Sequence, residues 1–106
     1  MIRPEDLLRE TDHGLWCEPG GFFIDPMRPA DRAVVTHGHA DHARAGHAKV
    51  AATPETLAIM ASRYGEAFCE SRQVMAYGET VRMGEVDVSF HPAGHVLGSA
   101  QARLEW

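Results

Sequence analysis

Residues 36–43 have the sequence THGHADHA, which holds three histidines and one aspartate. The run that leads into them, RAVVTH (32–37), is largely apolar and predicts a short strand that ends at His37. Gly38 follows directly, and a glycine after a β-like run makes a continuous helix through the histidines unfavourable. The sequence therefore predicts a strand, a turn, and then a short helix in the alanine-rich stretch that ends at Ala48.

The spacing of the polar residues in this stretch predicts a metal site. On an extended backbone His37 and His39 project to the same side and can bind one metal, because alternate side chains of a strand share a face. Asp41 and His42 come after the turn and can reach a second metal beside the first. Surface histidines on a polar helix would not explain this pattern, and the histidine pair of a helical zinc protease is absent. Such donors suit zinc, and manganese tolerates the same set.

A further ligand is expected from HPAGHVLGSA (91–100), because a catalytic zinc commonly takes three protein ligands. Of its two histidines, His91 ends an alternating strand on the polar side and is predicted to lie at the surface. His95 stands between Gly94 and Gly98 in a loop, where the backbone can approach a site closely. We therefore predict His95 as the metal ligand of this segment.

Three other polar residues carry weaker signals. Asp25 ends the run FFID and either accepts a hydrogen bond from the N–H of a metal-binding histidine or is an ordinary aspartate before Pro26. His47 either ends the short helix or lines the rim of the site. His13 lies in a polar stretch and needs no special role.

The rest of the pattern predicts a mixed α/β domain in which strands outnumber helices. The segment TPETLAIMASRYG (53–65) predicts a helix, because Thr53 can cap it, Pro54 suits its first position and Gly65 can stop it. Strands are expected at residues 15–17, 22–24, 32–37 and 49–53, as three strands within 73–95, and from residue 101 onward.

Composition and charge limit the classes of protein. With 106 residues, 44% hydrophobic and 24% charged, the sequence has the composition of one globular domain with a modest core. No apolar run reaches the roughly 18 residues of a membrane helix and the start lacks an export signal, so we expect a cytoplasmic protein without a membrane partner. Cys17 and Cys69 are then expected to be reduced thiols. The net charge of −5 argues mildly against nucleic acid, although basic residues outnumber acidic ones between residues 26 and 50.

Taken together, the motifs resemble the metallo-β-lactamase fold. THGHADHA is similar to the H-x-H-x-D-H signature of that family, Asp25 falls at its first motif and His95 at its third. GHVLGSA (94–100) is similar to the nucleic-acid branch of the fold that carries the β-CASP insertion. The runs RPEDLL, GGFFIDP, DRAVVTHGHADHA and ATPETLAIM resemble the bacterial ligase-associated DNA exonucleases of this branch.

This resemblance implies that residues 1–106 are the N-terminal half of an αββα four-layer sandwich. It implies two zinc ions bound by residues already singled out: His37, His39 and His95 for one ion, Asp41 and His42 for the other. Asp41 would also orient or deprotonate a water shared by the metals. The implied activity is zinc-dependent exonuclease cleavage of DNA, rather than RNA, phosphodiester bonds in repair, alongside a DNA ligase system. The family's metal-bridging aspartate, its next histidine and the β-CASP insertion are expected beyond Trp106.

Two alternatives stay open. A small-molecule hydrolase of the same fold would act on a thioester or a lactam, although the GHVLGSA segment argues against it. A non-catalytic metal-binding fragment is the alternative from a different class, because the ligands expected downstream of His95 are not in the sequence.

Overall fold

The computed structural model of the protein describes residues 3–94 and 97–106. Across these residues the chain forms two helices, nine strands and the loops between them. In chain order the elements are α1 (Pro4–Leu7), β1 (Leu8–Thr11), β2 (Gly14–Cys17), β3 (Phe22–Ile24), β4 (Arg32–Val34), β5 (Lys49–Ala52), α2 (Pro54–Tyr64), β6 (Ser71–Val74), β7 (Thr80–Met83), β8 (Val86–Pro92) and β9 (Ala100–Glu105). The predicted mixed α/β class is confirmed.

The first sheet has the strand order β1-β2-β3-β4-β5-β6. Its pairs are antiparallel from β1 to β3 and parallel from β3 to β6. Because β3 and β4 run in the same direction, the loops that follow them leave the sheet at the same edge. The topology therefore places residue 25 beside the histidine-rich stretch. In open α/β sheets, ligands bind at this carboxyl edge.

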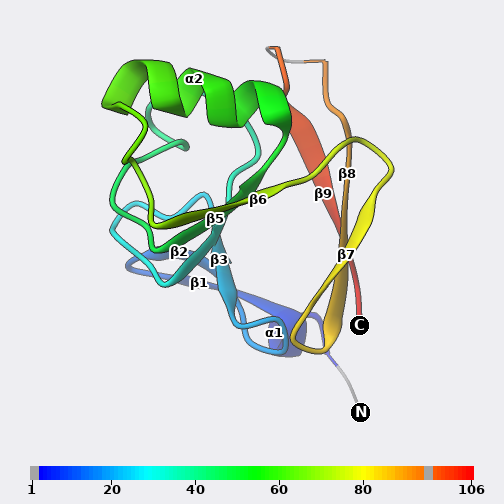
Figure 1. Ribbon diagram of the computed structural model, residues 1–106. Coiled ribbons are helices and arrows are strands. Elements are labelled where there is room, and N and C mark those ends of the chain that lie inside the picture. The colour runs from blue at the N-terminus through cyan, green and yellow to red at the C-terminus, as the bar shows by residue number, and fades with distance from the viewer. Residues whose placement is uncertain (1–2, 95–96) are drawn as a thin grey trace.

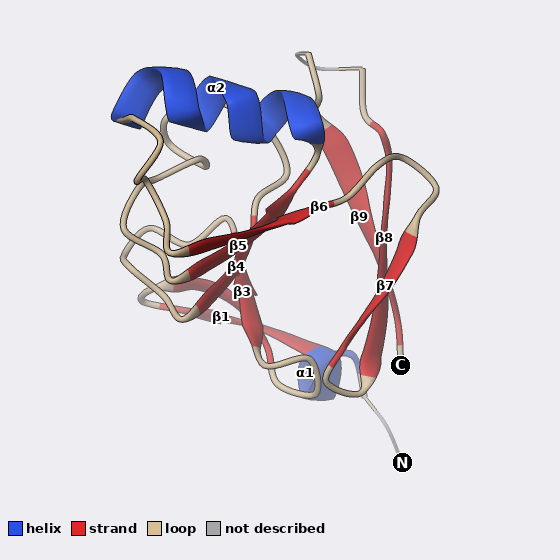
Figure 2. Ribbon diagram, in the orientation of Figure 1, coloured by secondary structure: helices blue, strands red, loops and turns tan. Residues whose placement is uncertain are grey.

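The second sheet is antiparallel, with the order β7-β8-β9, and it faces the first sheet (Figures 1 and 2). Apolar side chains of both sheets fill the space between them, among them Phe22 and Val34 from the first sheet and Val88 and Phe90 from the second. All four of these residues are almost completely buried. This cluster is the main core and joins the two sheets into a sandwich.

Helix α2 covers the opposite face of the first sheet (Figure 1). Leu57 and Met60 of the helix pack with apolar residues of β4 and β5 in a second buried cluster. The Thr53 hydroxyl accepts the Thr56 N–H at 3.2 Å, and Gly65 ends the helix with a φ of 94°. The helix predicted from its local capping signals is therefore confirmed. The layers of the fold are helix α2, the first sheet and the second sheet. Neither described helix is long and apolar enough to cross a membrane.

Two expectations around the histidines were wrong. The strand predicted over 32–37 ends at Val34, because the Thr36 N–H bonds to the carboxylate of Asp25 at 2.8 Å instead of continuing the ladder. The short helix expected after Gly38 is a single turn, in which the His39 carbonyl accepts the His42 N–H at 2.9 Å. Apart from this turn, residues 35–48 cross from the end of β4 to the start of the parallel strand β5 without regular secondary structure.

Candidate metal centre

The candidate site lies at the carboxyl edge of the first sheet. Asp25 directly follows β3, and the segment 36–42 follows β4 after one further residue. The register pairs Ile24 with Val34, and the Asp25 N–H donates to the Val34 carbonyl at 2.9 Å. Neighbouring parallel strands thus deliver the aspartate and the histidine loop to one place.

The carboxylate of Asp25 is the centre of a hydrogen-bond network. Its Oδ1 accepts the backbone N–H of Thr36 at 2.8 Å, and its Oδ2 accepts the Thr36 hydroxyl at 2.6 Å. Oδ2 also lies 3.0 Å from Nδ1 of His42. The Asp25 side chain is only 14% exposed, so water competes little for these contacts. One carboxylate therefore holds the start of the histidine loop and one of its rings.

This network selects the tautomers of two histidines. The Thr36 hydroxyl has a single proton, which it donates to Asp25, so towards Nδ1 of His37, 3.0 Å away, it can only accept. His37 therefore carries its proton on Nδ1, and His42 does so as well, because its Nδ1 faces a carboxylate. In both rings the lone pair is then on Nε2. A metal ligand needs such a lone pair, and an outer carboxylate that fixes the tautomer is the usual arrangement at metal sites.

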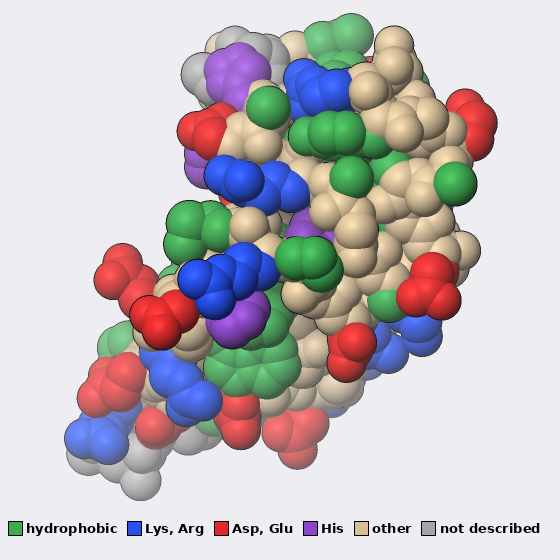
Figure 3. Space-filling model, turned by 90° about the vertical axis from the view of Figure 1, so that its left-hand side faces the viewer, with side chains coloured by type: hydrophobic (Ala, Val, Ile, Leu, Met, Phe, Trp, Pro, Cys, Tyr) green, Lys and Arg blue, Asp and Glu red, His purple; other side chains and the backbone are tan. Residues whose placement is uncertain are grey.

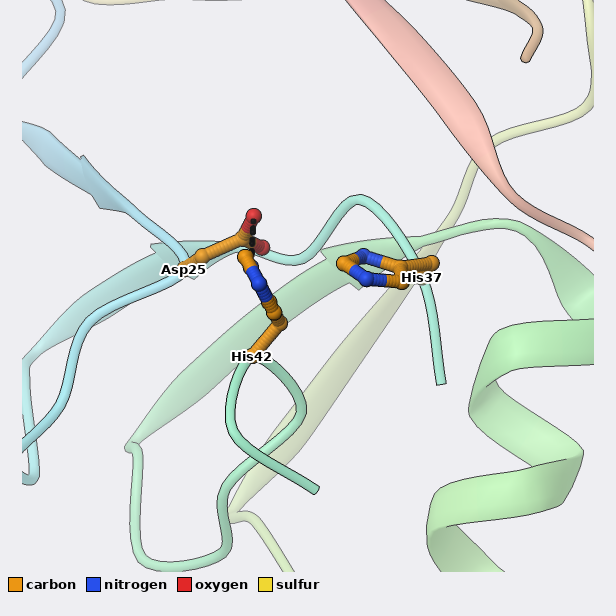
Figure 4. Close-up of side chains that lie close together, drawn as sticks. All are labelled: Asp25, His37 and His42. Atoms are coloured by element: carbon orange, nitrogen blue, oxygen red, sulfur yellow. Dashed lines mark hydrogen bonds and ion pairs between the residues drawn. The ribbon is translucent and has the colours of Figure 1, made fainter. Parts of the chain in front are cut away.

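The three side chains form a compact donor group (Figure 4). Donor atoms of Asp25, His37 and His42 all lie within 4.8 Å of one another. The rings of His37 and His42 have centroids 4.1 Å apart and are inclined by 51°. Two imidazole nitrogens oriented by an outer carboxylate are donors of the kind that zinc and manganese accept, so the residues present fit a metal ion.

The other residues predicted in this loop lie around the group. The His39 ring centroid is 5.1 Å from that of His37, and its side chain is exposed. Asp41 is 73% exposed, with Oδ2 at 3.5 Å from Nε2 of His42. The structure thus brings His37 closest to His42, whereas the spacing had paired it with His39. The division of these residues between two metals stays a prediction.

His95 lies outside the described residues, so its assignment as a ligand also stays a prediction. The described residues that follow it in the chain form hydrogen bonds to the site and to the start of α2. Ala100 donates its N–H to the Thr36 carbonyl at 2.7 Å, and the Gly98 carbonyl accepts the Thr53 hydroxyl at 2.7 Å. His91 lies on β8, half-buried, with Nε2 at 3.0 Å from the Ser89 hydroxyl.

Two residues have roles that the sequence did not reveal. Thr36 links Asp25 to His37, and its only sequence signal is a hydroxyl residue directly before the first histidine. His47 is 1% exposed and neither ends a helix nor lies at the surface. Its Nδ1 accepts the Ala30 N–H at 3.1 Å, which ties the loop before β4 to the loop before β5. Burial lowers the pKa of His47, so it stays neutral in this packing.

Comparisons with known proteins agree with a metal site. No protein-family model matches the chain. A probable DNA ligase of Opitutus terrae is 36% identical over 94 residues, which are 88% of this chain and 9% of the relative. A UPF0173 metal-dependent hydrolase of Haloarcula marismortui is 35% identical over 72 residues, which are 64% of this chain and 30% of the relative. The chain thus spans a small part of both relatives, and its homology is to a metal-dependent hydrolase and to a DNA-ligase-related protein.

Proposed function

We propose that the chain is the metal-binding part of a zinc-dependent nuclease of the β-CASP branch, a DNA exonuclease that acts with a ligase in the cytoplasm. The observation that carries this proposal is the network that orients His37 and His42 with their Nε2 lone pairs available to a metal. The printed names of the two relatives support it, because one is a metal-dependent hydrolase and the other a probable DNA ligase.

A bound zinc pair would lower the pKa of a shared water and offset the charge of the phosphodiester that this water attacks. The chain's residues would share the remaining work. His37, with His39 and His95, would hold one zinc, and His42, with Asp41, would hold the other. His37 and His42 would bind through Nε2. Asp25 and Thr36 keep both Nδ1 atoms protonated and the rings fixed. Asp41, exposed beside His42, is the carboxylate that would orient the attacking water and accept its proton.

A small-molecule metallohydrolase is the second candidate, because the Haloarcula relative is named only as a metal-dependent hydrolase. The donor group itself would serve either substrate, since a metal-activated water attacks phosphorus and carbonyl carbon alike. The two candidates are therefore separated by substrate and not by metal content.

The test begins with metal content by elemental analysis after dialysis, followed by hydrolysis of end-labelled DNA, RNA and a thioester with added zinc or manganese. We expect bound zinc, and DNA degradation that His37→Ala abolishes. His91→Ala is the matched control, because His91 lies on the second sheet and contacts Ser89, and it should bind metal like the wild type. Thioester hydrolysis without DNA cleavage would favour the second candidate. Equal metal loss in both variants would contradict the ligand assignment.

A further inference from the structure

A row of side chains crosses the first sheet next to the candidate metal centre. The strand register pairs Arg9 with Trp16 and Trp16 with Phe23, so the three residues lie side by side on β1, β2 and β3. Cys17 and Phe22 belong to the core between the sheets. Because successive side chains of a strand alternate, Trp16 and Phe23 point to the opposite face, the one that carries α2.

The aromatic rings of this row form a platform, here called the Trp16–Phe23 platform. The centroids of Trp16 and Phe23 are 4.7 Å apart, and the ring of His13 extends the group at 6.0 Å from Phe23. Trp16 and Phe23 are only half-buried, and His13 is exposed. The rings lie in a shallow depression lined by Arg9, Thr11, His13, Trp16, Glu18 and Phe23.

Helix α2 does not cover the platform. Among the described residues, the buried members of the cluster beneath α2 come from β4, β5, the helix and the loops beside them, and none comes from β1, β2 or β3. One surface of the molecule shows exposed hydrophobic side chains in contact with histidine and with Lys and Arg (Figure 3). The described part of the chain therefore leaves these rings accessible to a flat ligand.

At the platform Arg9 and Glu18 form an ion pair, and a further cation lies on the neighbouring loop. The one carboxylate that lines it, Glu18, accepts the indole N–H of Trp16 and lies 3.8 Å from Arg9, so partners within the cluster already engage its charge. Arg28 belongs to this loop and is not among the residues that line the depression: Met27, directly before it, donates its N–H to the His13 carbonyl at 2.8 Å. Arg28 is exposed, and no acidic partner is found for it among the described residues.

The platform is also continuous with the candidate metal centre. Phe23 lies on β3 and precedes Asp25, which directly follows that strand, by two residues, which is roughly 7 Å along the chain. A chain of nucleotides seated on the rings would therefore reach the metal-binding loop without crossing the rest of the sheet.

We propose that the Trp16–Phe23 platform stacks the bases of single-stranded nucleic acid and guides the strand to the metal centre, an inference that rests on the proposed nuclease function. Aromatic rings stack on any base, so binding is expected to be tolerant of sequence and sensitive to salt. Two half-buried rings provide surface for one or two bases. Duplex DNA, whose bases are already stacked, should bind more weakly.

The experiment measures binding in EDTA, where no metal-dependent cleavage occurs. The sequence has two tryptophans, so in a Trp106→Phe background the fluorescence of Trp16 reports on the platform alone. We expect saturable quenching by oligo(dT) and oligo(dA). In fluorescence anisotropy with labelled oligonucleotides, Trp16→Leu and Phe23→Leu should bind roughly 5- to 100-fold more weakly, and Trp16→Phe should stay close to the wild type.

Arg103→Ala, an exposed cation on β9 of the second sheet, is the control and should change binding little. Thermal unfolding shows which variants are folded. If Trp16→Leu is not folded, the binding of Phe23→Leu provides the test. Unchanged binding by a folded leucine variant would overturn the inference, as would tighter binding of duplex DNA. Binding in EDTA without any nuclease activity would overturn the proposed function alone. DNA cleavage, together with DNA binding that the leucine substitutions leave unchanged, would overturn this inference alone.

Discussion

Asp25→Asn is the substitution that tests the candidate centre most directly. The two side chains have the same shape, and asparagine also tolerates a positive φ, so the backbone at φ 47° is kept. The amide oxygen can still accept the Thr36 N–H. The amide nitrogen, however, cannot accept a proton from the Thr36 hydroxyl or from Nδ1 of His42. The change therefore removes the orienting acceptor and little else.

The expected magnitude follows from the bonds that are lost. Replacing an outer hydrogen-bond partner of a metal-binding histidine lowers metal affinity about 10- to 100-fold, which is about 1.4–2.7 kcal/mol. The free energy of unfolding without metal should fall by about 3 kcal/mol or more, because two hydrogen bonds to a carboxylate are lost, each worth about 1.5–3 kcal/mol. Thr36→Val removes the hydroxyl alone and should weaken metal binding less, since the contact between Asp25 and His42 remains.

Both quantities can be measured on the same samples. Titration of zinc against a competing chelator gives the affinity, and thermal unfolding followed by circular dichroism gives the stability. An Asp25→Asn chain that binds zinc as tightly as the wild type would refute the orienting role. A loss of a thousandfold or more would show instead that Asp25 is itself a metal ligand, which the 4.8 Å spacing of the donor atoms permits.

Three further predictions concern residues outside the donor group. Burial lowers the pKa of His47, so the unfolded chain takes up a proton near pH 6.5 while the folded chain does not. Below that pH the free energy of unfolding should therefore fall by up to about 1.4 kcal/mol per pH unit. His47→Gln should reduce this pH dependence, as measured by denaturant titrations at several pH values. Thr53→Val removes the helix cap and the bond to the Gly98 carbonyl, and should lower the unfolding free energy by about 1–3 kcal/mol, with an unchanged melting temperature as the contrary result. Burial raises the pKa of the Cys69 thiol, so its alkylation, followed by mass spectrometry, should still be accelerating above pH 9, whereas the buried Cys17 should react only on unfolding.

Local signals predicted the parts of the fold that depend on local chemistry. The helix at Pro54–Tyr64 is recognisable because its cap, its first proline and its terminal glycine are all adjacent to it in sequence. The strands β3 and β5 were likewise visible as short apolar runs. The strand β1 was not foreseen, because LRET is largely polar and becomes a strand only by pairing with β2. Pairing between segments is a non-local property that composition does not record.

The candidate centre, too, could be predicted from the sequence only in part. The residue types and their crowding could be read from the sequence, and they predicted metal binding. Which rings approach each other could not, because this depends on the turn that carries His42 back towards His37. The role of Thr36 depends on the contact between the ends of β3 and β4, eleven residues apart in the chain.

The hydrogen bonds of Asp25 explain why an aspartate, and not a glycine, follows β3. Among the described residues other than glycine, Asp25 alone has a positive φ, of 47°. Such a conformation costs of order 1–3 kcal/mol and persists where the surrounding contacts determine it, which is common at functional sites. A residue needed only to end β3 could be glycine, which adopts this conformation without strain. Glycine would lack the carboxylate that Thr36 and His42 contact, so it is the binding of the histidine loop that requires aspartate here.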